Sequence, residues 1–181
     1  MRLIVDACVL YPTVLREVVL GVAKSGVFTP LWSDRILSEW THAAARLGPD
    51  QAVFSTSEAA ILRTQFPNAV VVADDVLESQ LYLPDENDCH VLAAAITGQA
   101  DGVLTLNLKD FPKRILADYG LSPVGPDAFF YQLAMATPEL LRPVTDKVHA
   151  DAETLSGHTI SARSLYKKAR LPRMAKIFYG A

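Results

Sequence analysis

The sequence predicts an α/β fold built on a parallel sheet, because short apolar strands alternate along it with helical segments. Residues 1–6 and 101–105 are compact apolar runs, which are typical of buried parallel strands. An amphipathic helical pattern follows the first of them at residues 13–25, where the valines share one face. Such alternation implies right-handed crossovers, so the carboxyl ends of the strands lie at one edge of the sheet. Ligand sites of parallel sheets lie just beyond that edge.

The other elements are predicted from caps and from breaks in the apolar pattern. Ser33 is a good N-cap for a helix that runs to about residue 47. Ser55 and Glu58 have the capping-box spacing, which predicts a helix that begins there and runs to Gln65. Further expected elements are a buried strand at 69–72, helical segments at 75–80, 89–98 and 113–119, and a short edge strand at 121–124.

Beyond residue 125 the pattern is helical, so we expect a helical C-terminal extension at residues 126–181. Its end, residues 160–181, contains six basic residues and no acid, which leaves a charge of −9 on residues 1–159 within a net charge of −3. This division excludes a uniformly basic nucleic-acid binder and is compatible with an acidic site and a basic tail. A solvated helix face is the plain structural interpretation of the same basic residues.

The composition is that of an ordinary soluble protein. Half of the residues are apolar and a fifth are charged. No charged-then-apolar leader is present, and no apolar run approaches the roughly 20 residues of a membrane span. Cys8 and Cys89 are too few for a disulfide framework. We therefore expect a cytoplasmic protein that does not associate with membranes.

Acidic residues occur where the predicted strands end. Asp6 closes the first strand, Asp88 lies in a crowd of acids at the start of a small-residue helix, and Asp110 follows a later strand. We expect these three to converge, with Glu39 reaching in from a helix, although a turn cap and an exposed helical acid are the plain interpretations of Asp6 and Glu39. Carboxylates so close together cannot all stay ionised without cations. Hard divalent ions prefer oxygen ligands, so Mg²⁺ or Mn²⁺ fits better than zinc.

Four blocks of this sequence resemble the signature of the PIN-domain nucleases, most closely that of VapC-type bacterial toxins. The blocks are Val5-Asp6, Ser38-Glu39, residues 85–95 (DENDCHVLAAA) and residues 105–111 (TLNLKDF). They occur in order, and the resemblance covers roughly residues 1–125. It implies a PIN-like three-layer α/β/α sandwich with a central parallel sheet of about five strands. It also implies a divalent-metal-dependent endoribonuclease that uses Mg²⁺ or Mn²⁺.

Carried over residue by residue, the resemblance implies that Asp6, Glu39, Asp88 and Asp110 are the catalytic and metal-binding acids. Asn107 stands where many members have an aspartate, and we interpret it as a neutral ligand through its carbonyl. Candidates for the remaining roles are Thr105 for holding water or phosphate, Asp85 and Glu86 for supplementing or replacing Asp88, and Lys109 and Arg114 for contacting phosphate.

The remaining polar residues near these blocks have simpler expected roles. His90, at the first turn of its helix, is expected to pack or to form a hydrogen bond, and His42 lies one turn beyond Glu39. Neither forms a nucleophile–base arrangement with serine or cysteine. Cys8 and Cys89 are expected to be small buried fillers.

The resemblance further implies an RNA substrate, a homodimer, and a small antitoxin that inserts a basic side chain or a helix near the acids. One alternative is a catalytically silent PIN-like module that binds RNA or protein, and the intact set of acids argues against it. Another is a metal-dependent DNA or structure-specific nuclease, which the sequence does not separate from a ribonuclease. A dehalogenase-type phosphatase is weaker, because Cys8 occupies the position of its second acid.

Overall fold

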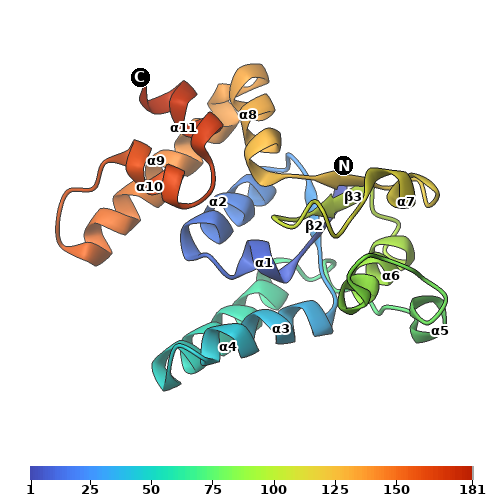
Figure 1. Ribbon diagram of the computed structural model, residues 1–181. Coiled ribbons are helices and arrows are strands. Elements are labelled where there is room, and N and C mark those ends of the chain that lie inside the picture. The colour runs from blue at the N-terminus through green and yellow to red at the C-terminus, as the bar shows by residue number, and fades with distance from the viewer. Residues whose placement is uncertain (181) are drawn as a thin grey trace. The chain divides into compact units, whose positions relative to one another are not determined.

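The computed structural model describes residues 1–180, which form two compact units (Figure 1). The sheet unit consists of Met1–Tyr11 and Phe28–Val124. The helical unit consists of Pro12–Val27 and the chain from Gly125 onward. The sequence predicts a division near residue 125, and in the structure a long segment of the helical unit begins at that residue.

A parallel sheet of four strands forms the centre of the sheet unit, in the order β2-β1-β3-β4. The register pairs Ile4 of β1 with Leu31 of β2 and with Val103 of β3, and all three side chains are fully buried. The strands are β1 Arg2–Val5, β2 Thr29–Leu31, β3 Gly102–Leu104 and β4 Ser122–Val124. The predicted α/β class with a parallel sheet is therefore confirmed.

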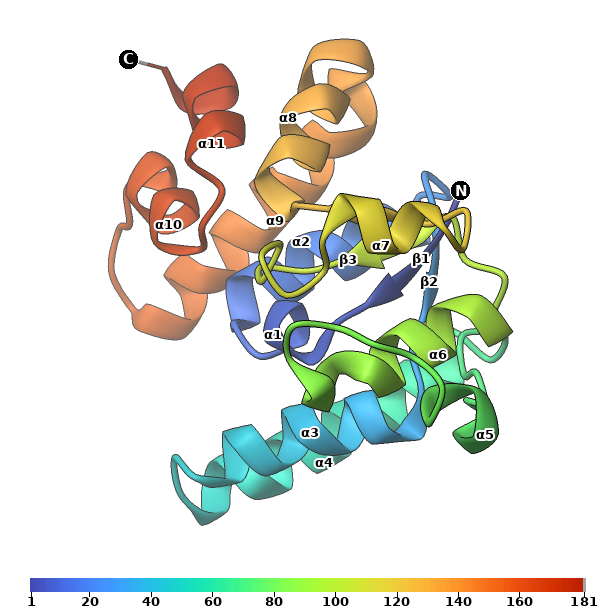
Figure 2. The same cartoon turned by 45° about the vertical axis from the view of Figure 1, so that its right-hand side comes forward.

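Helices surround this sheet and carry Glu39, Glu86, Asp88 and Arg114 among the residues that the sequence singles out. Ser33 caps α3 as predicted, because its Oγ accepts a hydrogen bond of 3.2 Å from the amide of Ile36. Helices α3 and α4 lie side by side (Figure 2), and α6 packs on β1 and β3. The helices are α1 Ala7–Leu10, α3 Asp34–Ala45, α4 Pro49–Gln65, α5 Asp75–Glu78, the 3₁₀ turn η1 Glu86–Asp88, α6 Cys89–Thr97 and α7 Lys113–Ala117.

The predicted start of a helix at Ser55 is wrong. Helix α4 begins at Pro49, directly after Gly48, and already includes Ser55. The Ser55 hydroxyl donates to the backbone oxygen of Ala52 and does not cap a helix. Proline suits the first position of a helix because its missing N–H would have no partner there, and this signal marks the true start.

The predicted buried strand at residues 69–72 is also wrong. Val70 forms one isolated bridge with Trp32, and the side chain of Val72 is 84% exposed. The physical reason is that β2, the strand beside residues 69–72, is short. It ends at Leu31, and the chain enters a capped helix at Ser33. Little extended backbone is left for residues 69–72 to pair with, so the expected sheet of about five strands is reduced to four and this bridge.

The helical unit combines one early helix with the C-terminal helices. Helix α2 packs on α9, α9 on α8, and α11 on both α8 and α10. At the first of these contacts a Cβ on Gly21 would lie 2.5 Å from Cγ1 of Val144, so the two helices approach as closely as only glycine allows. The helices are α2 Thr13–Lys24, α8 Pro126–Ala136, α9 Pro138–Ser156, α10 Ala162–Lys168 and α11 Pro172–Tyr179.

Tyr166 anchors the core of the helical unit. Its side chain is fully buried, its hydroxyl donates to the backbone oxygen of Thr145, and burial raises its pKa. Tyr179 stacks on it with ring centroids 5.5 Å apart and donates to the Thr145 hydroxyl at 3.0 Å. Within residues 1–180 no helix is both long enough and apolar enough to cross a membrane.

Candidate metal centre

Asp6 lies where the central strand β1 ends and is only 6% exposed. It caps the short helix α1, which the sequence analysis did not predict. Its Oδ1 accepts from the amide of Cys8 at 3.4 Å, and its Oδ2 accepts from the Cys8 thiol at 3.0 Å. Burial and the Asp6 charge raise the pKa of Cys8 to about 12, so this thiol stays protonated and acts as a donor. Asp6 is therefore a buried carboxylate held in place at the carboxyl edge of the sheet.

Thr105, directly after β3, fixes Asp6 from the neighbouring strand. Its side chain is fully buried, and its Oγ1 donates to Oδ2 of Asp6 at 2.6 Å. The same oxygen accepts from the amide of Asn107 at 2.9 Å, which binds the following loop to the strand end. Thr105 thus contacts a proposed metal ligand directly, while the water or phosphate contact expected from the sequence stays a prediction.

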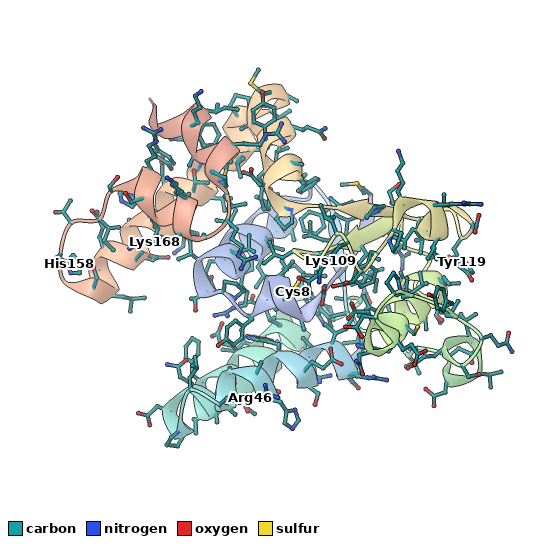
Figure 3. The ribbon with its side chains drawn as sticks, viewed as in Figure 1. Cys8, Arg46, Lys109, Tyr119, His158 and Lys168 are labelled. Atoms are coloured by element: carbon teal, nitrogen blue, oxygen red, sulfur yellow. The ribbon has the colours of Figure 1, made fainter. Side chains whose placement is uncertain are left out.

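The loop after β3 presents Asp110. The backbone oxygen of Asn107 accepts from the amide of Asp110 at 2.9 Å, and this turn leaves the Asp110 side chain 16% exposed. The Asn107 residue itself is exposed. The ammonium of Lys109 lies 3.8 Å from Oδ1 of Asp110 and is otherwise open to solvent. Cys8 and Lys109, both labelled in Figure 3, mark the position of this region.

Asp88 shows that the acids converge. It lies between η1 and α6, and its pKa is raised from 3.8 to about 6. Burial is the largest cause, followed by the negative charges of Asp6, Asp85 and Asp110, while His90 acts in the opposite direction. The structure therefore brings the predicted acids Asp6, Asp88 and Asp110 within electrostatic reach of one another. An uncompensated carboxylate cluster of this kind favours either a proton or a cation.

Asp85 and Glu86 differ in their surroundings. Asp85 caps η1, because its Oδ1 accepts from the amide of Asn87 at 3.0 Å and from its Nδ2 at 2.9 Å. Glu86 is exposed and lines a separate cavity of about 580 Å³ with Glu78 and Tyr82. Asp85 adds charge to the cluster while serving as a cap.

Glu39 is engaged by two basic side chains. Its Oε1 lies 2.9 Å from Nε2 of His90 and 3.5 Å from Nε of Arg35. Arg35 in turn pairs with Glu78 at 2.9 Å, which links α3 to α5. His90 is buried and contacts Glu39 through Nε2, and the expectation that it packs at the first helical turn is confirmed. His42 contacts the preceding turn of its own helix, with Nδ1 2.7 Å from the backbone oxygen of Ser38.

The contacts of Glu39 were not predicted from the sequence, although a signal for one of them was present. Arg35 lies one helical turn before Glu39, and oppositely charged residues at this spacing commonly pair on a helix. His90 gives no comparable local signal, because it reaches Glu39 from a different helix. The carboxylate of Glu39 is 41% exposed and retains one oxygen outside these two contacts.

The oxygen-rich donor set fits a hard divalent cation. Among residues 1–180, no three His, Cys, Asp or Glu side chains are placed so that they could hold one ion together. Mg²⁺ does not require such a cage, since it is usually bound through one or two carboxylates and keeps several waters. Asp6 and Asp88 supply two carboxylates, and the raised pKa of Asp88 indicates that the negative charge around it is not fully compensated.

Comparison with known proteins identifies the family. The sequence matches the PIN domain over residues 2–109, which include β1 to β3 and the acids Asp6, Glu39 and Asp88, while Asp110 directly follows the matched range. No curated protein and no solved structure matches it significantly. PIN domains are generally nucleases and typically use divalent metals. Because the match covers more than half of the 181 residues, the chain belongs to the PIN domain family.

Proposed function

We propose that this protein is a divalent-metal-dependent endoribonuclease that hydrolyses RNA phosphodiester bonds. The observation that supports it most directly is the raised pKa of Asp88, to which Asp6, Asp85 and Asp110 all contribute. A nuclease of this type needs a cluster of carboxylates that a cation can neutralise. A catalytically silent binding module has no reason to concentrate negative charge where RNA must approach.

In this proposal Asp6 and Asp88 hold the cation, Asp110 adds its negative charge beside them, and Glu39 stabilises the pairing of α3 with α6. When bound, Mg²⁺ or Mn²⁺ supplies Lewis acidity and lowers the pKa of a water molecule. Thr105 keeps Oδ2 of Asp6 in a fixed orientation through the 2.6 Å hydrogen bond. The protein thereby fixes the ligand geometry before substrate arrives.

Substrate phosphates are repelled by bare carboxylates, so cationic side chains must also contribute. Lys109 is 85% exposed beside Asp110, and Arg114 is exposed on α7, which follows the same loop. We propose both as phosphate contacts. Neither Lys109 nor Arg114 forms a tight ion pair within residues 1–180, so both can approach a phosphodiester.

The resemblance to VapC-type toxins also supports a proposal about the biological role of the protein. We propose that the protein is the toxin of a toxin–antitoxin pair, that it forms a homodimer, and that it acts in the cytoplasm. A small antitoxin would then neutralise it by bringing a basic side chain or a helix to the acids. Coexpression with a candidate antitoxin followed by size-exclusion chromatography tests the first two statements.

Cleavage of total RNA and of single-stranded DNA by the purified protein tests the activity directly. Each substrate is incubated with Mg²⁺, Mn²⁺ or EDTA, and the wild type is compared with Asp6→Asn and Asp88→Asn. Asp118→Asn is the matched control, because Asp118 is an exposed acid of the same unit at the end of α7. We expect metal-dependent RNA cleavage that both site variants lose and the control retains.

The other outcomes separate the alternatives. Cleavage of DNA in preference to RNA would identify a DNA nuclease with the same metal chemistry. Folded wild-type protein that cuts neither substrate and binds no Mn²⁺ would favour the silent binding module.

A further inference from the structure

Two short helices at the end of the helical unit carry a concentration of positive charge. Helices α10 and α11 pack against each other (Figure 2), and the segment from residue 160 onward contains no acid. We call its cationic side chains the basic surface: Arg163, Lys167, Lys168, Arg170, Arg173 and Lys176.

All six residues of the basic surface are exposed, and none takes part in an ion pair within residues 1–180. The two basic residues of α9 behave differently. Arg142 pairs with Asp146 at 2.9 Å, and Lys147 pairs with Asp151 at 2.6 Å. The cations of the basic surface are thus unpaired, whereas the lysine and the arginine of α9 are both paired.

The apolar sides of α10 and α11 account for the outward placement of these cations. Tyr166 on α10 and Met174 on α11 are fully buried in the core of the helical unit. Lys167 follows Arg163 by one turn on α10, so both lie on one face of the helix. Lys168, on the same helix, is labelled in Figure 3.

Asp127 and Tyr131 are the neighbours of the basic surface on α8. The carboxylate of Asp127 accepts from the backbone amides of Arg173 and Met174, at 3.0 and 3.3 Å, and so caps α11. The guanidinium of Arg173 lies 4.1 Å from the ring centroid of Tyr131. This stacking orders the Arg173 side chain without neutralising its charge.

Arg170 joins the two helices in a conformation that usually belongs to glycine. Its φ is +62°, and its amide donates to the backbone oxygen of Lys167 at 3.2 Å. The amide of Leu171 donates to the backbone oxygen of Tyr166 at 2.8 Å. These two bonds form the Schellman ending of a helix, where glycine avoids a steric cost of about 1–2 kcal/mol. The chain bears that cost and places a sixth cation between α10 and α11.

We propose that the basic surface binds the phosphate backbone of single-stranded RNA. This inference deepens the proposed ribonuclease function and rests on it for the choice of RNA. Uncompensated lysines and arginines attract phosphates and gain affinity by releasing counterions. A membrane-binding helix would also expose an apolar face for insertion. None of the large hydrophobic side chains of residues 157–180 is exposed, so the surface favours a polyanion that is read by charge alone.

Binding is tested with full-length protein in EDTA, where RNA is not cleaved. The probe is a fluorescently labelled RNA of mixed sequence, titrated at several salt concentrations and followed by anisotropy. The variant is Lys167→Gln/Lys168→Gln. Its control is Lys24→Gln/Arg46→Gln, which also removes two exposed cations and leaves the basic surface intact. Phosphatidylserine vesicles and polyglutamate are run in parallel as other polyanions.

We expect the surface variant to bind RNA about tenfold more weakly and to reduce the slope of log K against log salt by about 1 per lysine removed, while the control changes neither. Three outcomes would overturn the proposal: the wild type does not bind RNA, the surface variant binds RNA as well as the control does, or the protein prefers vesicles or polyglutamate. RNA binding through the basic surface without metal-dependent cleavage would uphold this inference and refute the proposed nuclease activity.

Discussion

The carboxylate of Glu39 lies 2.9 Å from Nε2 of His90, and this contact joins α3 to the start of α6. His90 is 2% exposed, whereas the side chain of Glu39 is 41% exposed. The Nδ1 atom of His90 is buried and has no hydrogen-bond partner among residues 1–180. Nε2 is therefore the ring atom that holds His90 in place. Asp88 lies two residues before it, so this contact also fixes the backbone that presents an acid of the metal centre.

We expect the Glu39–His90 contact to stabilise the fold measurably. A double-mutant cycle with Glu39→Ala, His90→Ala and the double variant should give a coupling free energy of about 0.5–1 kcal/mol in urea unfolding, because a buried ring loses its contact with a carboxylate whose charge solvent partly screens. Glu39→Gln keeps an oxygen acceptor and should cost less than Glu39→Ala. A coupling below about 0.3 kcal/mol would show that the two residues contribute independently.

Removing the Thr105 hydroxyl should loosen Asp6. Thr105→Val keeps the volume but deletes the 2.6 Å hydrogen bond to Asp6 and the acceptor for the Asn107 amide. We expect about 1.5–3 kcal/mol lower stability and about 10–100-fold weaker Mn²⁺ binding, measured by urea unfolding and by calorimetry. Thr105→Ser is the control, since it keeps the hydroxyl. Equal Mn²⁺ affinity in Thr105→Val and Thr105→Ser would remove Thr105 from the metal centre.

The raised pKa of Asp88 predicts how stability changes with pH in the absence of metal. The pKa is about 6 in the folded protein and 3.8 as an ordinary carboxyl, so the folded state holds this proton more tightly. The resulting stabilisation is complete below about pH 4 and is lost as the pH rises through about 6. In EDTA, Asp88→Asn should therefore be more stable than the wild type at pH 7 and differ little from it at pH 4. A gain of the same size at both pH values would contradict a raised pKa.

A bound cation should instead favour the ionised form of Asp88, because it competes with the proton for the same carboxylate. Mn²⁺ affinity should accordingly fall as the pH decreases below about 6. Asp85→Asn should shift this fall to lower pH, because it removes one of the negative charges that raise the pKa of Asp88. Calorimetric titrations across this range measure both effects.

The residues at the carboxyl edge of the sheet could be predicted from the sequence because their positions depend on short local stretches. Apolar runs that end on Asp6 and on Thr105 become parallel strands, and parallel strands place their carboxyl ends together. Asp88 was predictable for a similar reason, as an acid at the start of an apolar helix. These positions depend on short stretches of chain and on one rule of topology.

What could not be predicted depends on partners distant in sequence. The valines at residues 69–72 have a strong strand propensity, but a strand needs a neighbour, and the chain after Trp32 enters a helix. The direction of the Glu39 side chain depends on His90, which comes from another helix. The conformation of Arg170 follows from the way α10 ends, and arginine gives no sequence signal for a left-handed residue.

The close approach of α2 to α9 predicts a sign reversal. Gly21→Ala alone should destabilise the protein by about 1 kcal/mol, because the new methyl group would lie 2.5 Å from Cγ1 of Val144, a side chain with little rotational freedom. In a Val144→Ala background the same substitution should stabilise by up to about 1 kcal/mol, because alanine favours the helix more than glycine does. Thermal or urea unfolding of the four proteins gives both values. The same sign in both backgrounds would exclude a steric limit at this contact.

Arg170 should show opposite effects on stability and on RNA binding. Arg170→Gly relieves the left-handed backbone at φ +62° and should raise the free energy of unfolding by about 1 kcal/mol. The same change removes a cation of the basic surface, so RNA affinity and its salt dependence should both fall. Arg170→Ala separates the causes: it loses the charge without relieving the backbone, so it should weaken binding without the gain in stability. If Arg170→Gly bound RNA as tightly as the wild type, the cation at this position would not contribute, and the strain there would need a reason within the fold.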